Sequence, residues 1–79
     1  MNPDTIRDLI EQGLPGARAL VRGDDGVHFE AEVVCAAFAG KSLIARHRMV
    51  YATLGALMGR EIHALAITVA RTPDEAAAG

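Results

Sequence analysis

The sequence of 79 residues contains one cysteine, one tyrosine, two phenylalanines and no tryptophan. A single cysteine, Cys35, excludes an internal disulfide, so folding requires no oxidising compartment. Because aromatic side chains are so few, the core has to be built mainly from aliphatic residues. The hydrophobic content of 51% is nevertheless too high for a disordered chain. The length predicts one domain rather than two, spanning residues 1–79.

The charge balance and the hydropathy pattern argue against two further classes of protein. The formal net charge is -2, whereas a domain that holds nucleic acid mainly through phosphates usually carries a basic excess. The net charge does not exclude a local basic patch. No apolar run is long enough to cross a bilayer, and the N-terminal segment carries charges where a signal peptide has its apolar part. We therefore expect a cytoplasmic protein without membrane attachment.

The first half of the chain predicts a helix followed by a hairpin. A start signal at Asn2 and Pro3 precedes an apolar stripe of Ile6, Leu9 and Ile10, and the stretch 13–16, with two glycines and a proline, ends the helix. Two alternating segments then flank Gly23-Asp24-Asp25-Gly26, a tight-turn signal. The inward-facing residues are Ala19, Val21, Phe29, Ala31, Val33 and Cys35. On the other face, the expected cross-strand charge pairs involve Arg18, Arg22, Glu30 and Glu32.

The second half predicts one turn of helix near residues 36–40, a long helix and a third strand. Ser42 caps the long helix, which is expected to run to about Met58 and to be closed by Gly59. Its apolar stripe comprises Leu43, Ile44, His47, Val50, Tyr51, Leu54, Leu57 and Met58. The opposite face is poor in charge and is therefore expected to meet a partner; it holds Ala45, Met49, Ala52, Gly55 and Ala56, with Arg46, Arg48 and Thr53 as its only polar members.

The third strand is expected over Ile62–Ala70, with His63 in the same inward phase as Leu65, Ile67 and Val69. Thr72-Pro73-Asp74-Glu75 has the form of a capping box, and residues 76–79 are expected to fray. The element order is therefore α-β-β-(short α)-α-β. Three strands with both helices on one face make a two-layer α+β sandwich.

Several runs together resemble the BolA family. They are Phe38-x-Gly40-x-Ser42, Arg46-His47-Arg48-x-Val50-Tyr51-x-x-Leu54, Ile62-His63-Ala64-Leu65 and Thr72-Pro73-x-Glu75. The Asp-rich turn followed by His28-Phe29 is most similar to the IbaG-like bacterial branch of that family. The resemblance covers nearly the whole chain, and it implies a fold similar to a class II KH domain.

The resemblance also implies a partner and a cofactor. BolA-like proteins bind monothiol glutaredoxins, and the two proteins share a bridging [2Fe–2S] cluster, with glutathione supplied by the partner, in iron–sulfur trafficking and redox homeostasis. The family's C-terminal histidine ligand matches His63. Its second ligand, a His or Cys between the first two strands, falls on Asp25, whose hard carboxylate suits such a cluster poorly. His28 lies close by in the sequence and is the alternative ligand.

The remaining residues favour a binding module over an enzyme. No nucleophile–base pair, carboxylate dyad or phosphate-binding glycine loop is present. His47 fits a packed core position in which its ring is hydrogen-bonded to a backbone carbonyl, and Cys35 fits a buried structural position. The expected docking surface is the alanine-rich face of the long helix or the edge of the third strand, and the expected partner-binding residues are Met49, Ala52, Arg46 and Arg48. The sequence allows either a monomer or a homodimer of the isolated domain.

The alternative function is a nucleic-acid-binding transcriptional regulator with a KH-like fold. It would use a basic edge made of Lys41, Arg46, Arg48 and Arg60. A KH domain clamps its strand with a Gly-x-x-Gly loop between helices, and none is predicted between two helices of this chain. The spacing of Gly23 and Gly26 matches, but it lies in the predicted hairpin and contains two aspartates, which would repel phosphate.

Overall fold

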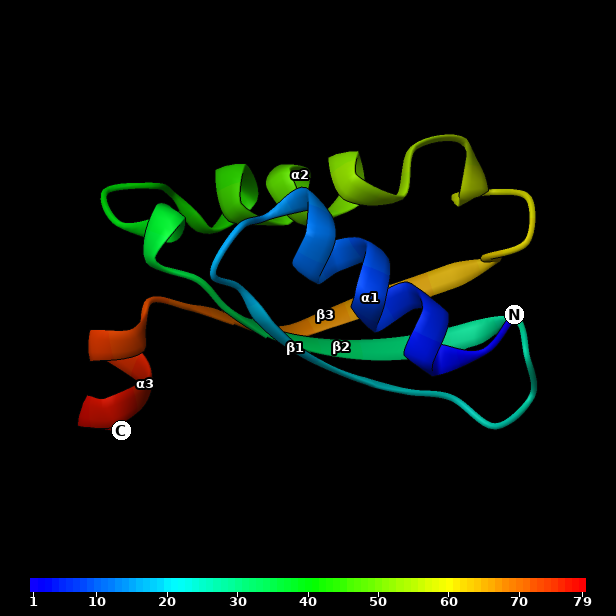
Figure 1. Ribbon diagram of the computed structural model, residues 1–79, viewed down its shortest axis with the longest axis horizontal. Helices are drawn as coiled ribbons and strands as arrows, with labels where there is room; N and C mark the ends of the chain where they lie inside the picture. Colours follow the sequence, from blue (N-terminus) through cyan, green and yellow to red (C-terminus); the bar gives the residue numbers. More distant parts are fainter.

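The computed structural model describes residues 1–79 (Figure 1). Two helices, α1 and α2, lie over one face of a three-stranded sheet, and the short helix α3 lies beyond one end of the sheet. In chain order the elements are α1 (Pro3–Gly13), β1 (Arg18–Arg22), β2 (His28–Val34), η1 (Ala36–Phe38), α2 (Leu43–Leu54), η2 (Gly55–Leu57), β3 (Ala64–Arg71) and α3 (Pro73–Ala78), where η marks a single 3-10 turn. The predicted order of elements and the two-layer α+β architecture are confirmed.

The sheet has the order β1-β2-β3 and is mixed. β1 pairs antiparallel with β2 through the hairpin, whereas β2 pairs parallel with β3. Parallel neighbours need a crossover connection, and the segment containing α2 provides it across one face of the sheet. The alternation predicted for β2 is confirmed, because every second residue from Phe29 to Cys35 is buried against the helices.

The core lies between this face of the sheet and the two long helices. It consists of Ile6, Ile10, Leu14, Ala17, Phe29, Ala31, Val33, Cys35, Phe38, Val50, Leu54, Ile62, Leu65 and Ala70. No polar or charged residue is buried with them. Full burial of one large aliphatic side chain contributes roughly 1.5–3 kcal/mol. The small domain is therefore stabilised mainly by aliphatic side chains, as the scarcity of aromatic residues indicates.

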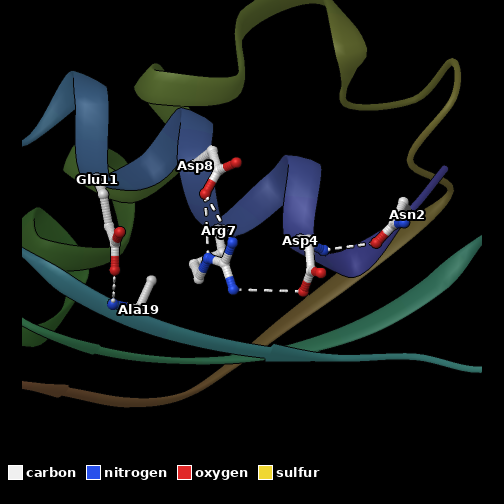
Figure 2. A network of polar contacts seen from close by, with 6 residues as sticks. All are labelled: Asn2, Asp4, Arg7, Asp8, Glu11 and Ala19. Carbon is white, nitrogen blue, oxygen red and sulfur yellow. Dashed lines mark hydrogen bonds and ion pairs between the residues drawn. The ribbon is translucent and has the colours of Figure 1, made fainter.

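α1 begins as the sequence predicts. The side chain of Asn2 caps the helix by accepting a hydrogen bond from the N–H of Asp4 at 2.8 Å, and Pro3 occupies the first turn. Figure 2 shows the outer side of this helix, where Arg7 forms ion pairs with Asp4 and Asp8. These pairs are exposed to solvent, so their contribution to stability is small.

The hairpin connection is wider than the tight turn that the sequence predicts. Residues 23–27 lie outside both strands, and among them only Gly26 has a positive φ, of 80°. The predicted charge pairing on the open face is partly formed: Arg22 pairs with Glu32, whereas Arg18 lies opposite Val34 and forms no ion pair. The face assignment of β1 is correct, because Ala19 and Val21 pack against the core.

The buried face of α2 differs from the predicted stripe. Val50 and Leu54 are buried, but Leu43 and Ile44 are 60% and 64% exposed. Arg46, expected on the outer face, has a side chain that is only 12% exposed. The N-terminal turn of α2 therefore presents apolar residues to solvent and directs an arginine towards the sheet, which a helical wheel based on hydrophobicity cannot indicate.

The end of α2 and the start of β3 also differ from prediction. α2 ends at Leu54, four residues earlier than expected, because Gly55 adopts a positive φ of 53° and a single 3-10 turn follows. β3 starts at Ala64 rather than at Ile62, which forms only an isolated bridge with Met58. His63 consequently lies in the bend before the strand, not within it.

β3 contains a bulge that changes the face of its later residues. Ala31 pairs with Ile67 but Glu32 pairs with Val69, so Thr68 is the extra residue. Leu65 before the bulge and Ala70 after it are both buried. The expectation that Val69 continues the inward phase is therefore wrong. Near the C-terminus the capping box of Thr72 and Glu75 is present, and helix α3 extends to Ala78 across residues that the sequence led us to expect as a frayed tail.

Both outer edges of the sheet form hydrogen bonds with helix side chains. On β1, the N–H of Ala19 donates to the carboxylate of Glu11 at 2.9 Å, as Figure 2 shows. On β3, the carbonyl of Leu65 accepts from the Tyr51 hydroxyl at 2.7 Å and that of Ala70 accepts from Arg46 at 2.9 Å. These contacts reduce the number of free edge groups that could pair with another chain.

Candidate functional site

His63 lies in the bend that leads into β3, and its side chain is exposed. Its backbone N–H donates to the carbonyl of Val27 at 3.0 Å, and the N–H of Ala64 donates to the same oxygen at 3.2 Å. The backbone at His63 is therefore fixed to the start of β2. The only histidine ring that hydrogen-bonds to another protein group is that of His28, so the imidazole of His63 is free on both nitrogens.

His28 and Asp25 form a compact polar unit at the end of the hairpin. One oxygen of Asp25 accepts from the N–H of Val27 at 2.9 Å and from that of His28 at 2.8 Å. Its other oxygen lies 2.6 Å from Nδ1 of the His28 ring. These hydrogen bonds, the one from the backbone of His28 first, hold the pKa of Asp25 well below its usual range.

This arrangement gives the two residues different roles. The carboxylate of Asp25 closes the loop, so both of its oxygens already have partners. Because a carboxylate only accepts hydrogen bonds, Nδ1 of His28 carries the proton in this contact, and the neutral form of the ring has a free lone pair on Nε2. A carboxylate that orients an imidazole in this way is the usual companion of a metal-ligating histidine. The chemistry of the pair therefore fits His28 as a ligand and Asp25 as its support.

The two exposed imidazoles lie at one end of the sheet, one at the start of β2 and the other in the bend that precedes β3. His28 is the first residue of β2 and pairs with Ala64. His63 is the residue immediately before Ala64 in the chain. No group of three or more His, Cys, Asp or Glu side chains is arranged to hold a metal ion. Cys35 is 1% exposed and so is not accessible as a thiolate ligand. At most two ligands at this end come from the chain's own histidines.

The residues expected on a partner-binding face of α2 have separate environments. Arg48 and Ala52 are exposed, and Met49 is half-buried against the core. The guanidinium of Arg46 donates to the carbonyls of Lys41 at 3.0 Å and Ala70 at 2.9 Å.

Arg46 also binds both carboxylate oxygens of Glu75, at 2.6 and 3.1 Å, and lies 5.8 Å from the centre of the Phe38 ring. Its donors are thus engaged within the fold, which argues against the expected place of Arg46 on a docking surface or a basic edge. Sequence reasoning missed this role because the partner, Glu75, is remote in the chain. Without Arg46, the proposed basic edge is reduced to Lys41, Arg48 and Arg60, all exposed and without ion pairs.

His47 also departs from expectation. It is half-buried on α2 and accepts or donates no hydrogen bond through its ring, so it is not the hydrogen-bonded core histidine that its place in the apolar stripe predicts. The Gly23 to Gly26 segment lies in the hairpin connection, as the sequence indicates, and joins strands rather than helices.

Comparison with known proteins gives consistent matches along the chain. The family model described as BolA-like protein matches residues 12–75. Protein BOLA2 of Arabidopsis thaliana is 51% identical over 70% of this chain and 58% of its own length. BolA-like protein 1 of Homo sapiens is 45% identical over 89% of this chain and 57% of its own length. The chain thus spans little more than half of these curated relatives.

The solved structure of a bolA protein homologue from Coxiella burnetii has the same fold. It superposes with a TM-score of 0.87 at 42% identity and covers 98% of this chain and 97% of its own. The predicted class II KH-like topology is confirmed by this similarity. No helix has the length and apolar character needed to span a membrane. The family model and these relatives show that the chain belongs to the BolA family, which is generally non-enzymatic.

Proposed function

We propose that this protein is a non-enzymatic partner of a monothiol glutaredoxin and that it contributes His63 to a [2Fe–2S] cluster shared with that protein. The observation that carries the proposal is the exposed, unbonded imidazole of His63 on a backbone fixed to β2. Membership of the BolA family supports it, since such a partnership is typical of the family.

The donor set of the chain suits such a cluster only as a shared one. Imidazole nitrogen can replace thiolate on one iron, and the resulting bond is sensitive to protonation. With Cys35 buried in the core, the thiolates have to come from the glutaredoxin cysteine and from glutathione bound to it. When bound, the cluster would supply redox and transfer chemistry, whereas this chain supplies the nitrogen ligand and the docking surface.

We further propose that His28, rather than Asp25, is the second ligand offered by this chain. The free lone pair on Nε2 of His28 supports this choice, and so does the engagement of both Asp25 oxygens within the loop. Asp25 would then orient the ligand without touching iron. The exposed part of α2 around Arg48 and Ala52, with Met49 beside it, is the proposed docking surface.

Titration with a cluster-loaded monothiol glutaredoxin, followed by visible circular dichroism, tests this function. We expect the wild type to produce a new spectrum at one equivalent and His63→Ala to abolish it. His28→Ala should shift the new circular dichroism bands, whereas Asp25→Ala should weaken these bands without removing them. His47→Ala is the matched control, because His47 is the remaining histidine and lies on another element. An unchanged spectrum, or a His63→Ala variant that behaves like the wild type, would refute the proposal.

Three finer points belong to the same proposal. The Asp-rich turn followed by His28 supports placement in the IbaG-like branch, and we propose a cytoplasmic location. Nucleic-acid binding is not favoured, because Arg46 is committed to Glu75 and no Gly-x-x-Gly loop joins two helices. Fluorescence anisotropy with single- and double-stranded probes over a range of salt distinguishes the two functions. Saturable binding with a steep salt dependence would favour the regulator instead.

A further inference from the structure

The open face of the sheet carries two arginines in one row at the end away from the histidines. Val34, the last residue of β2, pairs with Arg18 on one side and with Arg71 on the other. Paired residues in neighbouring strands point to the same face, and the buried neighbours Val33 and Ala70 face the helices. Arg18 and Arg71 therefore flank Val34 on the uncovered face. Two strand spacings place their Cα atoms about 10 Å apart.

Neither arginine has an intramolecular anionic partner. Arg7, Arg22 and Arg46 all form ion pairs with carboxylates, whereas Arg18 and Arg71 form none. Glu32 lies diagonally next to both in the sheet, but its carboxylate is bound to Arg22. Both side chains are exposed and long enough to converge above Val34. The row thus presents two unneutralised guanidinium groups across an apolar residue.

A hollow adjoins this row. It is lined by Gly16, Arg18, Val34, Pro73 and Ala76. One wall comes from the turn before β1, the floor from the sheet and the other wall from α3. Apart from Arg18 the lining is apolar or glycine, and it contains no acidic residue. α3 is held in this position by the double hydrogen bond between Glu75 and Arg46.

We propose that Arg18 and Arg71 form a binding site for a phosphomonoester, with the phosphate above Val34 and the organic group in the hollow. A guanidinium pairs with phosphate through two parallel hydrogen bonds. A single arginine satisfies the two oxygens of a carboxylate, whereas a terminal phosphate has a third oxygen for an arginine on the opposite side. The apolar walls favour an ester over the free inorganic ion.

This inference goes beyond the proposed cluster partnership and is independent of it. Val34 lies six residues along β2 from His28, which corresponds to roughly 20 Å in an extended strand. Removal of His63 should leave the phosphate site intact, and removal of Arg71 should leave the glutaredoxin titration unchanged. The two proposals can therefore fail separately.

Titration of the ¹⁵N-labelled protein at constant ionic strength tests the site, with inorganic phosphate and phenyl phosphate as probes. We expect saturable shifts of the backbone amides of Val34, Arg71, Ala76 and Gly16, with millimolar affinity for phosphate and several-fold tighter binding of phenyl phosphate. Constant ionic strength is needed because general screening would otherwise shift exposed residues.

Substitution of each arginine tests its contribution to phosphate binding. Arg18→Gln and Arg71→Gln should each weaken phenyl phosphate binding about tenfold, the effect of losing one charge-assisted contact. Arg60→Gln is the matched control, since Arg60 is exposed, forms no ion pair and lies outside the hollow and the arginine row. Shifts spread equally over Arg48 and Arg60, or unchanged affinity in Arg71→Gln, would overturn the site. Equal affinity for both probes would overturn the role of the hollow.

Discussion

The hydrogen bond between Glu11 and Ala19 allows a direct test of how the edge of β1 is protected. The Glu11 carboxylate accepts from the Ala19 N–H at 2.9 Å, on the side of β1 that has no neighbouring strand (Figure 2). Replacement of Glu11 by alanine removes the acceptor and leaves that N–H free. We expect two consequences, a loss of stability and a tendency to self-associate through the exposed edge.

The size of the first effect follows from the exposure of the pair. Both residues are half-buried, so water replaces the lost acceptor only in part. A net loss of about 1 kcal/mol is expected for one hydrogen bond of this kind. In a domain of this size such a loss lowers the melting temperature by about 4–8 °C. The higher helix propensity of alanine offsets a few tenths of a kcal/mol of this loss.

Thermal unfolding by circular dichroism measures the stability, and sedimentation velocity over a range of concentrations measures the association. Gln12→Ala is the control for helix propensity, because Gln12 is the exposed neighbour on the same helix and makes no side-chain hydrogen bond. Glu11→Gln keeps an oxygen acceptor and should fall between the two. If Glu11→Ala has the same melting temperature as Gln12→Ala and remains monomeric at the highest concentration, Glu11 does not protect the edge of β1.

Three further outcomes are expected. Hydrogen bonding to Arg46 lowers the pKa of Glu75 from 4.5 to about 2, so its stabilising effect is complete above pH 4.5 and is lost as the pH falls towards 2; Glu75→Gln should flatten the fall in melting temperature over that range. Gly13→Ala should lower the melting temperature, contrary to the usual gain in helices, because the added Cβ would lie 2.6 Å from Cγ2 of Thr53. The thiol of Cys35, 1% exposed, should react with dithionitrobenzoate only as fast as the protein unfolds, and rapid reaction in the native state would contradict its core position.

The elements of this fold were predictable where local signals are strong. The Asn2 cap, the alternation from Phe29 to Cys35 and the capping box of Thr72 and Glu75 all depend on residues close in sequence. Each signal describes a hydrogen bond or a face within one element. The hairpin was predicted for the same reason, although residues 23–27 connect its strands in place of a two-residue tight turn.

The errors arise where distant residues decide the structure. Thr68 interrupts the ladder between β2 and β3, and nothing in the local pattern of β3 indicates this extra residue. The burial of Arg46 depends on Glu75 and on the carbonyl of Ala70, so a helical wheel assigned its face incorrectly. Of the candidate site, the sequence indicated His63, but the environments of Asp25 and His28 required the three-dimensional arrangement of the loop.

The position of His63 just before β3 suits a ligand that is offered to another protein. Two N–H groups, those of His63 and Ala64, bind the one carbonyl of Val27, so the Cα position is fixed while the ring remains in solvent. A fixed backbone reduces the entropy lost when the imidazole binds a metal, and a free ring needs no internal hydrogen bond to be broken. Two residues later, at Leu65, the side chain is only 5% exposed beneath the helices. An imidazole at that inward position would be as rigid, but no partner could reach it.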